Sequence, residues 1–177
     1  VERGSKVIGY IPQQKSFAPG TPLRARDLVG MGVDGDKWGI RLRRGPVRAR
    51  VDELLAQVGA TSYADAPVGK LSGGELQRLR AAQALGTAPD LLLRDEPLLS
   101  LDLHHQQAIS ALIDERAHVH DSAVVFVTHE INPIIDCVDR ILYLADGAFT
   151  VGTPDEVLRS EVLTRLYGSP VEVIRRG

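Results

Sequence analysis

One segment restricts the fold more than any other. The run Ala123 to Val127 is apolar at every position and mostly β-branched or aromatic. A strand with one solvated face alternates apolar and polar residues, whereas a strand that is apolar throughout favours burial on both faces. Strands of that kind are typical of parallel sheets, whose crossover helices cover both sides. The run therefore predicts an α/β fold in which residues 123–127 form a strand covered on both faces.

The other expected elements follow from the same periodicities, two residues for strands and 3.6 for helices. Strands are expected at residues 6–11, 91–93, 141–144 and 149–151, the last two joined as a hairpin by the turn Asp146-Gly147. Helices are expected at residues 22–29, 46–58 and 75–85, with further helices from 102 and from a capping box at 153–156. The Gly- and Arg-rich residues 30–46 are expected to form an exposed connection.

Composition and charge exclude several classes of protein. The 177 residues are 44% hydrophobic and 25% charged, as in a soluble globular domain, and no apolar run approaches the ~20 residues that span a bilayer. The 21 basic and 23 acidic residues give a net charge of −2, which argues against nucleic acid as a partner held by bulk charge. The single cysteine, Cys137, excludes an internal disulfide and a cysteine-based zinc site, and it favours a reducing, cytosolic setting.

The segment 71–75, Leu-Ser-Gly-Gly-Glu, leads directly into a helical pattern. Two glycines after a serine allow backbone N–H groups to approach a phosphate, and the N-terminus of a helix carries partial positive charge that favours an anion. Ser72, Gly73 and Gly74 are therefore candidate phosphate ligands. The alternative is a capping box between Ser72 and Glu75 without a ligand, and the two interpretations are compatible.

Further candidate residues follow the expected strands. Asp95 and Glu96 end the second strand, where Asp95 could bind Mg²⁺ and Glu96 could deprotonate a water molecule. His129 follows the third strand and is expected at the same sheet edge, where an imidazole can bond a phosphate. Gln13 follows the first strand, and its amide oxygen could ligate Mg²⁺ or water. Taken singly, each of these is more often a solvated or structural residue.

Together these segments resemble, in chain order, the motifs of the ATP-binding-cassette ATPases, the motor subunits of ABC transporters. Residues 9–13 resemble the Q-loop, 71–77 the signature motif, 91–96 Walker B, 98–102 the D-loop and 128–130 the H-loop. The signature motif is the most specific of these, and the resemblance extends over nearly the whole chain from Val7 onward. It implies an α/β fold with a RecA-like P-loop NTPase core, here partial with its N-terminal portion absent, and an inserted helical subdomain.

The resemblance also implies domain boundaries and residue roles. Residues 1–14 and 71–177 would form the partial RecA-like ATPase core, and residues 15–70 the helical subdomain that leads into the signature motif. The implied catalytic residues are Glu96 as general base, His129 as a γ-phosphate contact, and Gln13 as a contact to Mg²⁺ and the lytic water. The implied cofactors are ATP, faced across a dimer by Ser72, Gly73, Gly74, Glu75 and Asp102, and Mg²⁺, served by Asp95 and Gln13.

Two departures from the family pattern are evident. No Gly-x-x-x-x-Gly-Lys-Ser/Thr loop, the Walker A motif that cradles the phosphates, precedes the Q-loop, and the sequence begins with Val1 rather than Met. We therefore expect that the first third of an ATPase is absent, and that this chain alone neither binds ATP tightly nor hydrolyses it. Arg94 puts a charge in the usually apolar Walker B strand, where it is expected to reach a sheet edge or to pair with a group from the absent part.

The C-terminal half, from Val127 to Pro170, resembles the ATPases of bacterial manganese and zinc importers, with iron-chelate importers as close competitors. The implied function is the ATP-binding subunit that couples ATP hydrolysis to import of a divalent metal ion. The implied partners are a second ATPase subunit in a homodimer and an integral-membrane permease, and the implied location is cytoplasmic, peripheral on the inner face of the cell membrane. Two alternatives stay open: a non-catalytic truncated module that acts through its signature face or by docking on a permease, and a non-transport ATPase of the same family.

Overall fold

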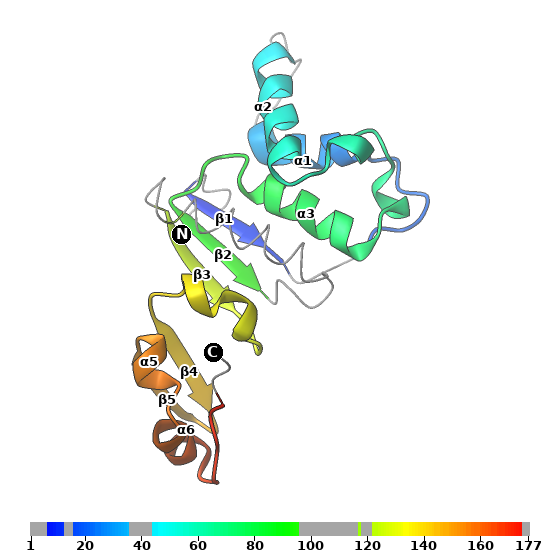
Figure 1. The fold of residues 1–177 in the computed structure, drawn as a ribbon. Coiled ribbons are helices and arrows are strands. Elements are labelled where there is room, and N and C mark those ends of the chain that lie inside the picture. The colour runs from blue at the N-terminus through cyan, green and yellow to red at the C-terminus, as the bar shows by residue number, and fades with distance from the viewer. Residues whose placement is uncertain (1–6, 13–15, 36–43, 96–116, 118–121, 175–177) are drawn as a thin grey trace. The chain divides into compact units, whose positions relative to one another are not determined.

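The structure is a computed structural model that describes residues 7–12, 16–35, 44–95, 117 and 122–174. The chain divides into two compact units, 1–130 and 131–177, and each holds its own sheet (Figure 1). Within the described ranges, no helix combines the length and apolar composition that crossing a membrane requires. The helix expected from residue 102 lies outside them. The subdomain boundaries expected from the resemblance stay a prediction.

The first unit is built on a three-stranded parallel sheet. Its strands are β1 (Ile8–Ile11), β2 (Leu91–Asp95) and β3 (Ala123–Val127), in the order β1-β2-β3. Ile11 lies opposite Arg94, and Arg94 lies opposite Phe126, so the three strands end at the same sheet edge (Figure 1). The expected α/β fold with a parallel sheet is confirmed.

The connection from β1 to β2 is helical, as a crossover between parallel strands requires. It contains α1 (Ala25–Asp34), α2 (Arg44–Gln57), the 3-10 turns η1 (Thr61–Tyr63) and η2 (Val68–Lys70), and α3 (Gly73–Ala84). α1 packs against α2 and α3, and α3 packs on β1. This last contact is close because Gly9 has no side chain: a Cβ there would stand 2.9 Å from the carbonyl oxygen of Ala84. α3 runs antiparallel to the strands, so its N-terminus and the C-terminal strand ends point in the same direction (Figure 1).

The helical core consists of apolar side chains at helical spacing. Almost completely buried members are Leu28, Leu54, Leu55, Leu79 and Leu85. Each buried leucine contributes roughly 1.5–3 kcal/mol, so the helices are held by packing on one another rather than by helix propensity alone.

α1 begins and ends later than the expected range 22–29. Its N-cap is Arg24, and the hydroxyl of Thr21 closes a turn by donating to the carbonyl oxygen of Ala18 instead of capping a helix. The helix continues to Asp34, so part of the expected connection at 30–46 is helical. The extension follows from packing, because Gly32 in this second half lies against the backbone carbonyl of Gln83 in α3.

No described residue covers the second face of the first sheet. Tyr10, Val125 and Val127 are 55%, 48% and 58% exposed there. The expectation that residues 123–127 are covered on both faces is therefore wrong. The described helices pack on one another and against β1 on the Gly9 side, so the apolar composition of β3 did not by itself determine its burial.

The second unit is a β-hairpin with short helical elements before and after it. Its elements are η3 (Asn132–Cys137), β4 (Ile141–Ala145), β5 (Ala148–Gly152), α5 (Pro154–Val157) and α6 (Ser160–Tyr167). Asp146 (φ 47°) and Gly147 (φ 78°) form the two-residue turn, and positive φ at both positions defines a type I′ hairpin. The expected hairpin is confirmed, as is the capping bond from the Thr153 N–H to the Glu156 carboxylate at 2.9 Å.

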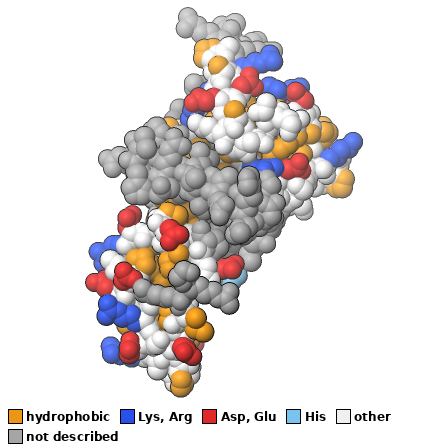
Figure 2. Space-filling view, in the orientation of Figure 1, with side chains coloured by type: hydrophobic (Ala, Val, Ile, Leu, Met, Phe, Trp, Pro, Cys, Tyr) orange, Lys and Arg blue, Asp and Glu red, His pale blue; other side chains and the backbone are white. Residues whose placement is uncertain are grey.

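One face of this hairpin is apolar and exposed. Leu142 pairs with Val151 and Leu144 with Phe149, and all four side chains are at least half exposed. Hydrophobic side chains are visible at the surface of this part of the chain in Figure 2. The helices α5 and α6 pack on β5, so the hairpin buries its other face.

Candidate functional site

The N-terminus of α3 forms the first part of the candidate site. Ser72 is the N-cap: its backbone N–H donates to the Glu75 carboxylate at 2.8 Å, and its hydroxyl donates to the same oxygen at 2.7 Å. The backbone N–H of Glu75 donates in return to the Ser72 hydroxyl oxygen at 3.3 Å. The expected capping box is confirmed, and it fixes the first turn of α3.

Exposure and the helix dipole at this helix end suit an anion, while the Glu75 carboxylate that caps it carries a negative charge. Hydrogen bonds from the Ser72 side chain and backbone lower the pKa of Glu75 below its ordinary 4.5, so the carboxylate is ionised at neutral pH. Ser72 is exposed, Gly73 and Gly74 are half-buried, and glycine carries no side chain to keep a phosphate from the backbone N–H groups. The aligned peptide dipoles place partial positive charge at this end.

The C-terminal edge of the first sheet forms the second part. Asp95 ends β2 opposite Val127, the last residue of β3, and the exposed His129 follows two positions later. The Thr128 hydroxyl donates to the Glu130 carbonyl at 2.9 Å and accepts from the Glu130 N–H at 3.1 Å, which closes a turn around His129. The parallel strands thus bring Asp95 and His129 to one edge.

Three of the predicted site residues lie outside the described residues, namely Gln13, Glu96 and Asp102. In the sequence Gln13 is two positions beyond the end of β1, and Glu96 directly follows Asp95. Their assigned roles therefore stay predictions.

Arg94 occupies β2 immediately before Asp95, and it faces the opposite side of the sheet because successive strand residues alternate. Its side chain is 1% exposed, so the expectation that it reaches a sheet edge is wrong, and the alternative expectation of a partner from the absent part stays a prediction. The guanidinium carbon lies 5.8 Å from the centroid of the Phe126 ring, within cation–π range. Burial lowers the pKa of Arg94 well below its ordinary value, to about 9, so the folded chain holds this charge at a cost in free energy.

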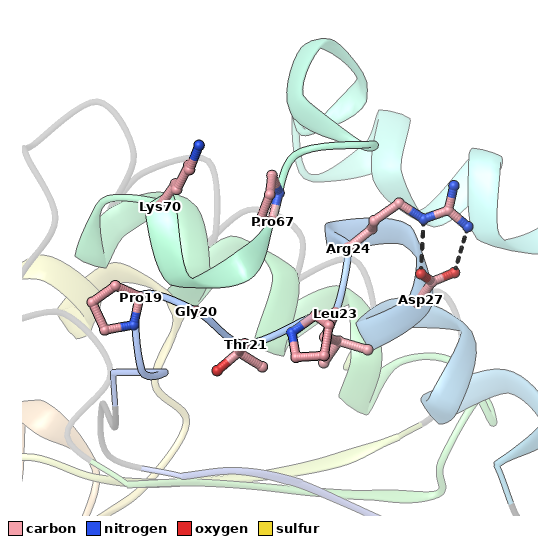
Figure 3. Close-up of a pocket in the computed structure, with 9 residues that line it drawn as sticks. Pro19, Gly20, Thr21, Leu23, Arg24, Asp27, Pro67 and Lys70 are labelled. Atoms are coloured by element: carbon pink, nitrogen blue, oxygen red, sulfur yellow. Dashed lines mark hydrogen bonds and ion pairs between the residues drawn. The ribbon is translucent and has the colours of Figure 1, made fainter.

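The sequence analysis missed an open pocket of about 440 Å³ in the first unit (Figure 3). It is lined by residues 19–24 together with Asp27, Pro67 and Lys70. Arg24 in this wall donates to the Asp27 carboxylate at 2.9 and 3.2 Å, as the dashed lines in Figure 3 show. The available signal was the set of prolines at 19, 22 and 67, which lack N–H donors and favour extended backbone.

The described residues suit a Mg²⁺ ion that is bound together with a nucleotide rather than by the protein alone. Among them, no group of three or more His, Cys, Asp or Glu side chains could hold a metal ion. In nucleotide sites, however, Mg²⁺ takes one or two carboxylates, while phosphate oxygens and waters complete its octahedron. Asp95 at the open sheet edge supplies one such carboxylate.

The parallel sheet and the similar solved structures place this fold in the class of the RecA-like P-loop NTPases. The chain belongs to the ABC transporter family, whose sequence model matches residues 1–99.

Similar curated proteins are import ATP-binding proteins by name. The zinc import ATP-binding protein ZnuC of Paramagnetospirillum magneticum is 34% identical over 97% of this chain and 62% of its own length. The hemin import ATP-binding protein HmuV of Rhodococcus jostii is 36% identical over 93% of this chain and 55% of its own length. The chain thus spans little more than half the length of the curated relatives it matches.

Solved structures of ABC proteins share the fold. One, described as an inward-facing conformation of a metal-chelate type ABC transporter, matches with a TM-score of 0.79 and 29% identity over 93% of this chain and 65% of that one. Another is an ATP-binding cassette solved as a dimer in a post-hydrolysis state with ADP and Pi. It matches with a TM-score of 0.72 and 30% identity over 82% of this chain and 62% of that one. These similarities confirm the fold class.

Proposed function

We propose that this chain is part of the ATP-binding subunit of an ABC importer, and that it engages ATP held by a second subunit through the N-terminus of α3. In this proposal Ser72, Gly73 and Gly74 contact the γ-phosphate of that ATP, while Glu75 fixes Ser72. The observation that carries the proposal is the capping box, which makes a glycine-led helix end rigid while Ser72 stays exposed. Such a helix end binds phosphate through its own backbone N–H groups.

The second part of the proposed chemistry takes place at the C-terminal edge of the first sheet. Asp95 would ligate Mg²⁺, which when bound neutralises charge on the phosphates, and His129 would hydrogen-bond the γ-phosphate. Glu96 would act as the general base for the attacking water, Gln13 would orient that water, and Asp102 would act across the dimer interface. The support for this half is the common sheet edge of Asp95 and His129.

The proposed cargo is a divalent metal ion, zinc or manganese, carried by an integral-membrane permease that the ATPase subunit drives from the cytoplasmic face of the membrane. A zinc import protein among the relatives supports a metal cargo, and the hemin import relative makes a chelate the competing cargo. Deleting the gene should lower uptake of radiolabelled zinc or manganese by the cell. A loss of hemin uptake with metal uptake unchanged would assign the chelate instead.

A second function is favoured by one observation. The α3 end that would face a partner's ATP is complete by itself, because its capping bonds all join Ser72 and Glu75. In this second proposal the chain is a non-catalytic module that donates only its α3 end to an intact ATPase.

ATP-dependent association tests engagement through α3, which both functions share, and turnover tests the non-catalytic function. The pure chain should show no ATPase turnover, and ordinary turnover would refute the non-catalytic function. Sedimentation should detect binding of the chain to a full-length zinc-import relative that holds Mg-ATP and carries a Glu→Gln change in its general base. Ser72→Arg should weaken that binding at least about tenfold, while Gly45→Ala, where a new Cβ meets open space, should not. Binding that is independent of ATP, or insensitive to Ser72→Arg, would refute engagement through α3.

A further inference from the structure

Gly69 lies three residues before Ser72, in the turn η2, and it packs directly against another segment of the backbone. A Cβ at Gly69 would clash with the carbonyl oxygen of Ala18 and stand 2.9 Å from the carbonyl carbon and the Cα of Pro19. Because these neighbours are backbone atoms, a side chain at position 69 requires one of the two segments to move.

Hydrogen bonds and a cation–π contact hold the segment 17–21, against which Gly69 packs. The Thr21 backbone N–H donates to the Ala18 carbonyl at 2.9 Å, and the Thr21 hydroxyl donates to the same oxygen at 2.8 Å. On the other side, the guanidinium of Arg80 lies 4.9 Å from the centroid of the Phe17 ring. Since Arg80 belongs to α3, the Ala18 carbonyl is fixed relative to the helix that Ser72 caps.

The residues before Gly69 are held as well. Val68 is 1% exposed, and its N–H donates to the Leu23 carbonyl at 2.9 Å. Two more backbone hydrogen bonds, at 3.0 and 2.8 Å, run from residues 25–26 to carbonyls of residues 64–66. This part of the loop cannot retreat from the start of α1 without breaking these bonds.

The residues after Gly69 lead straight to the helix cap. Only Lys70 and Leu71 intervene, and Leu71 is extended with φ −80° and ψ 147°. Ser72 continues the extended path with φ −64° and ψ 162° before α3 begins. With the loop held on its other side, a displacement of η2 would pass to Ser72.

We propose that Gly69 is a positioning residue for the phosphate-binding end of α3: by letting η2 lie against Ala18, it fixes where Ser72 is presented. The proposal rests on the proposed function for the nature of the bound group. The positioning itself is a property of this chain and is measurable without nucleotide.

Gly69→Ala in the 177-residue chain tests the positioning, with Gly20→Ala as the matched control because a Cβ at Gly20 meets open space. The readouts are the pKa of Glu75 from an NMR pH titration and the exchange rate of its amide hydrogen. Gly69→Ala should raise the pKa of Glu75 toward 4.5 and speed exchange about fivefold, because both depend on the geometry of the Ser72 cap. Equal values in the two variants would overturn the proposal.

The functional readout is ATP-dependent binding to the full-length relative described above. Gly69→Ala should weaken this binding severalfold. Ser72→Arg gives the reference for complete loss of binding, and Gly20→Ala should leave binding unchanged. If Ser72→Arg abolishes binding but Gly69→Ala does not, the positioning proposal fails while the proposed function holds. If the native chain itself does not bind, the proposed function fails, and the Glu75 titration alone decides the positioning.

A Gly69→Ala chain that does not fold would be replaced by Phe17→Leu, which removes the contact with Arg80 from the other side. This variant should shift the pKa of Glu75 in the same direction by a smaller amount. An unchanged pKa of Glu75 in the folded Phe17→Leu chain would overturn the proposal.

Discussion

Replacing Ser72 by alanine should destabilise the first turn of α3 by about 1 kcal/mol. The change removes the hydroxyl that accepts from the Glu75 N–H at 3.3 Å and donates to the Glu75 carboxylate at 2.7 Å. The first bond is at the long end of the useful range, and the second is charge-assisted and short. The backbone bond from Ser72 to Glu75 at 2.8 Å survives, so the loss should stay near the typical value for an N-cap serine rather than exceed it.

Amide hydrogen exchange measures this loss locally. A cost of about 1 kcal/mol should speed exchange about fivefold in the first turns of α3. Thr153→Ala, which alters the equivalent capping box at α5 in the other unit, is the matched control and should leave α3 unchanged. In a double-mutant cycle with Glu75→Gln, the two changes should be non-additive, because each residue is the other's partner.

The pH dependence of the Ser72 effect follows from the lowered pKa of Glu75. A carboxylate whose pKa is lowered in the folded state contributes stability that is present above its unfolded value of about 4.5 and is lost as the pH falls through the folded value. The difference between the native chain and Ser72→Ala should therefore shrink in acid. Unchanged exchange in α3 at neutral pH, or fully additive effects with Glu75→Gln, would refute the reasoning.

Four other changes test the packing and backbone arguments. Arg94→Met should change how stability to urea depends on pH, because burial lowers the pKa of folded Arg94 to about 9 while the unfolded chain keeps the proton to higher pH. The native chain should therefore gain stability relative to Arg94→Met as the pH rises above about 9, and a constant difference between the two chains would contradict this. Gly9→Ala should destabilise by roughly 1–3 kcal/mol against the Ala84 carbonyl, whereas Gly45→Ala in α2 should stabilise by up to about 1 kcal/mol in the same urea titrations. Gly147→Ala should destabilise the hairpin by roughly 1 kcal/mol because its φ is 78°, and an unchanged melting curve for the second unit would refute this.

Features that depend on neighbours within a few residues were predicted well from the sequence. The Ser72–Glu75 capping box and the Asp146-Gly147 turn are both present, because their hydrogen bonds and backbone angles are set locally. The edge that Asp95 shares with His129 was also predictable, since carboxyl ends of parallel strands coincide.

Features that depend on distant contacts were predicted poorly. α1 extends past residue 29 because Gly32 meets Gln83 of another helix, a contact that no local pattern encodes. The exposure of one face of β3 was not predicted for the same reason. An apolar sequence allows a strand to be buried, but whether it is buried depends on which elements pack against it. Arg94 shows the converse, since a charge expected at the rim is instead held inside.

The position of β3 has a practical consequence for handling the protein. β3 is the last strand on one side of the described sheet. It contains no proline or charged residue, and its valines Val125 and Val127 are exposed. Strands of this composition add to one another edge to edge, which makes concentrated samples prone to aggregate. A lysine in place of Val125 should therefore improve solubility in a precipitation assay, with little effect on the capped helix on the other side of the sheet.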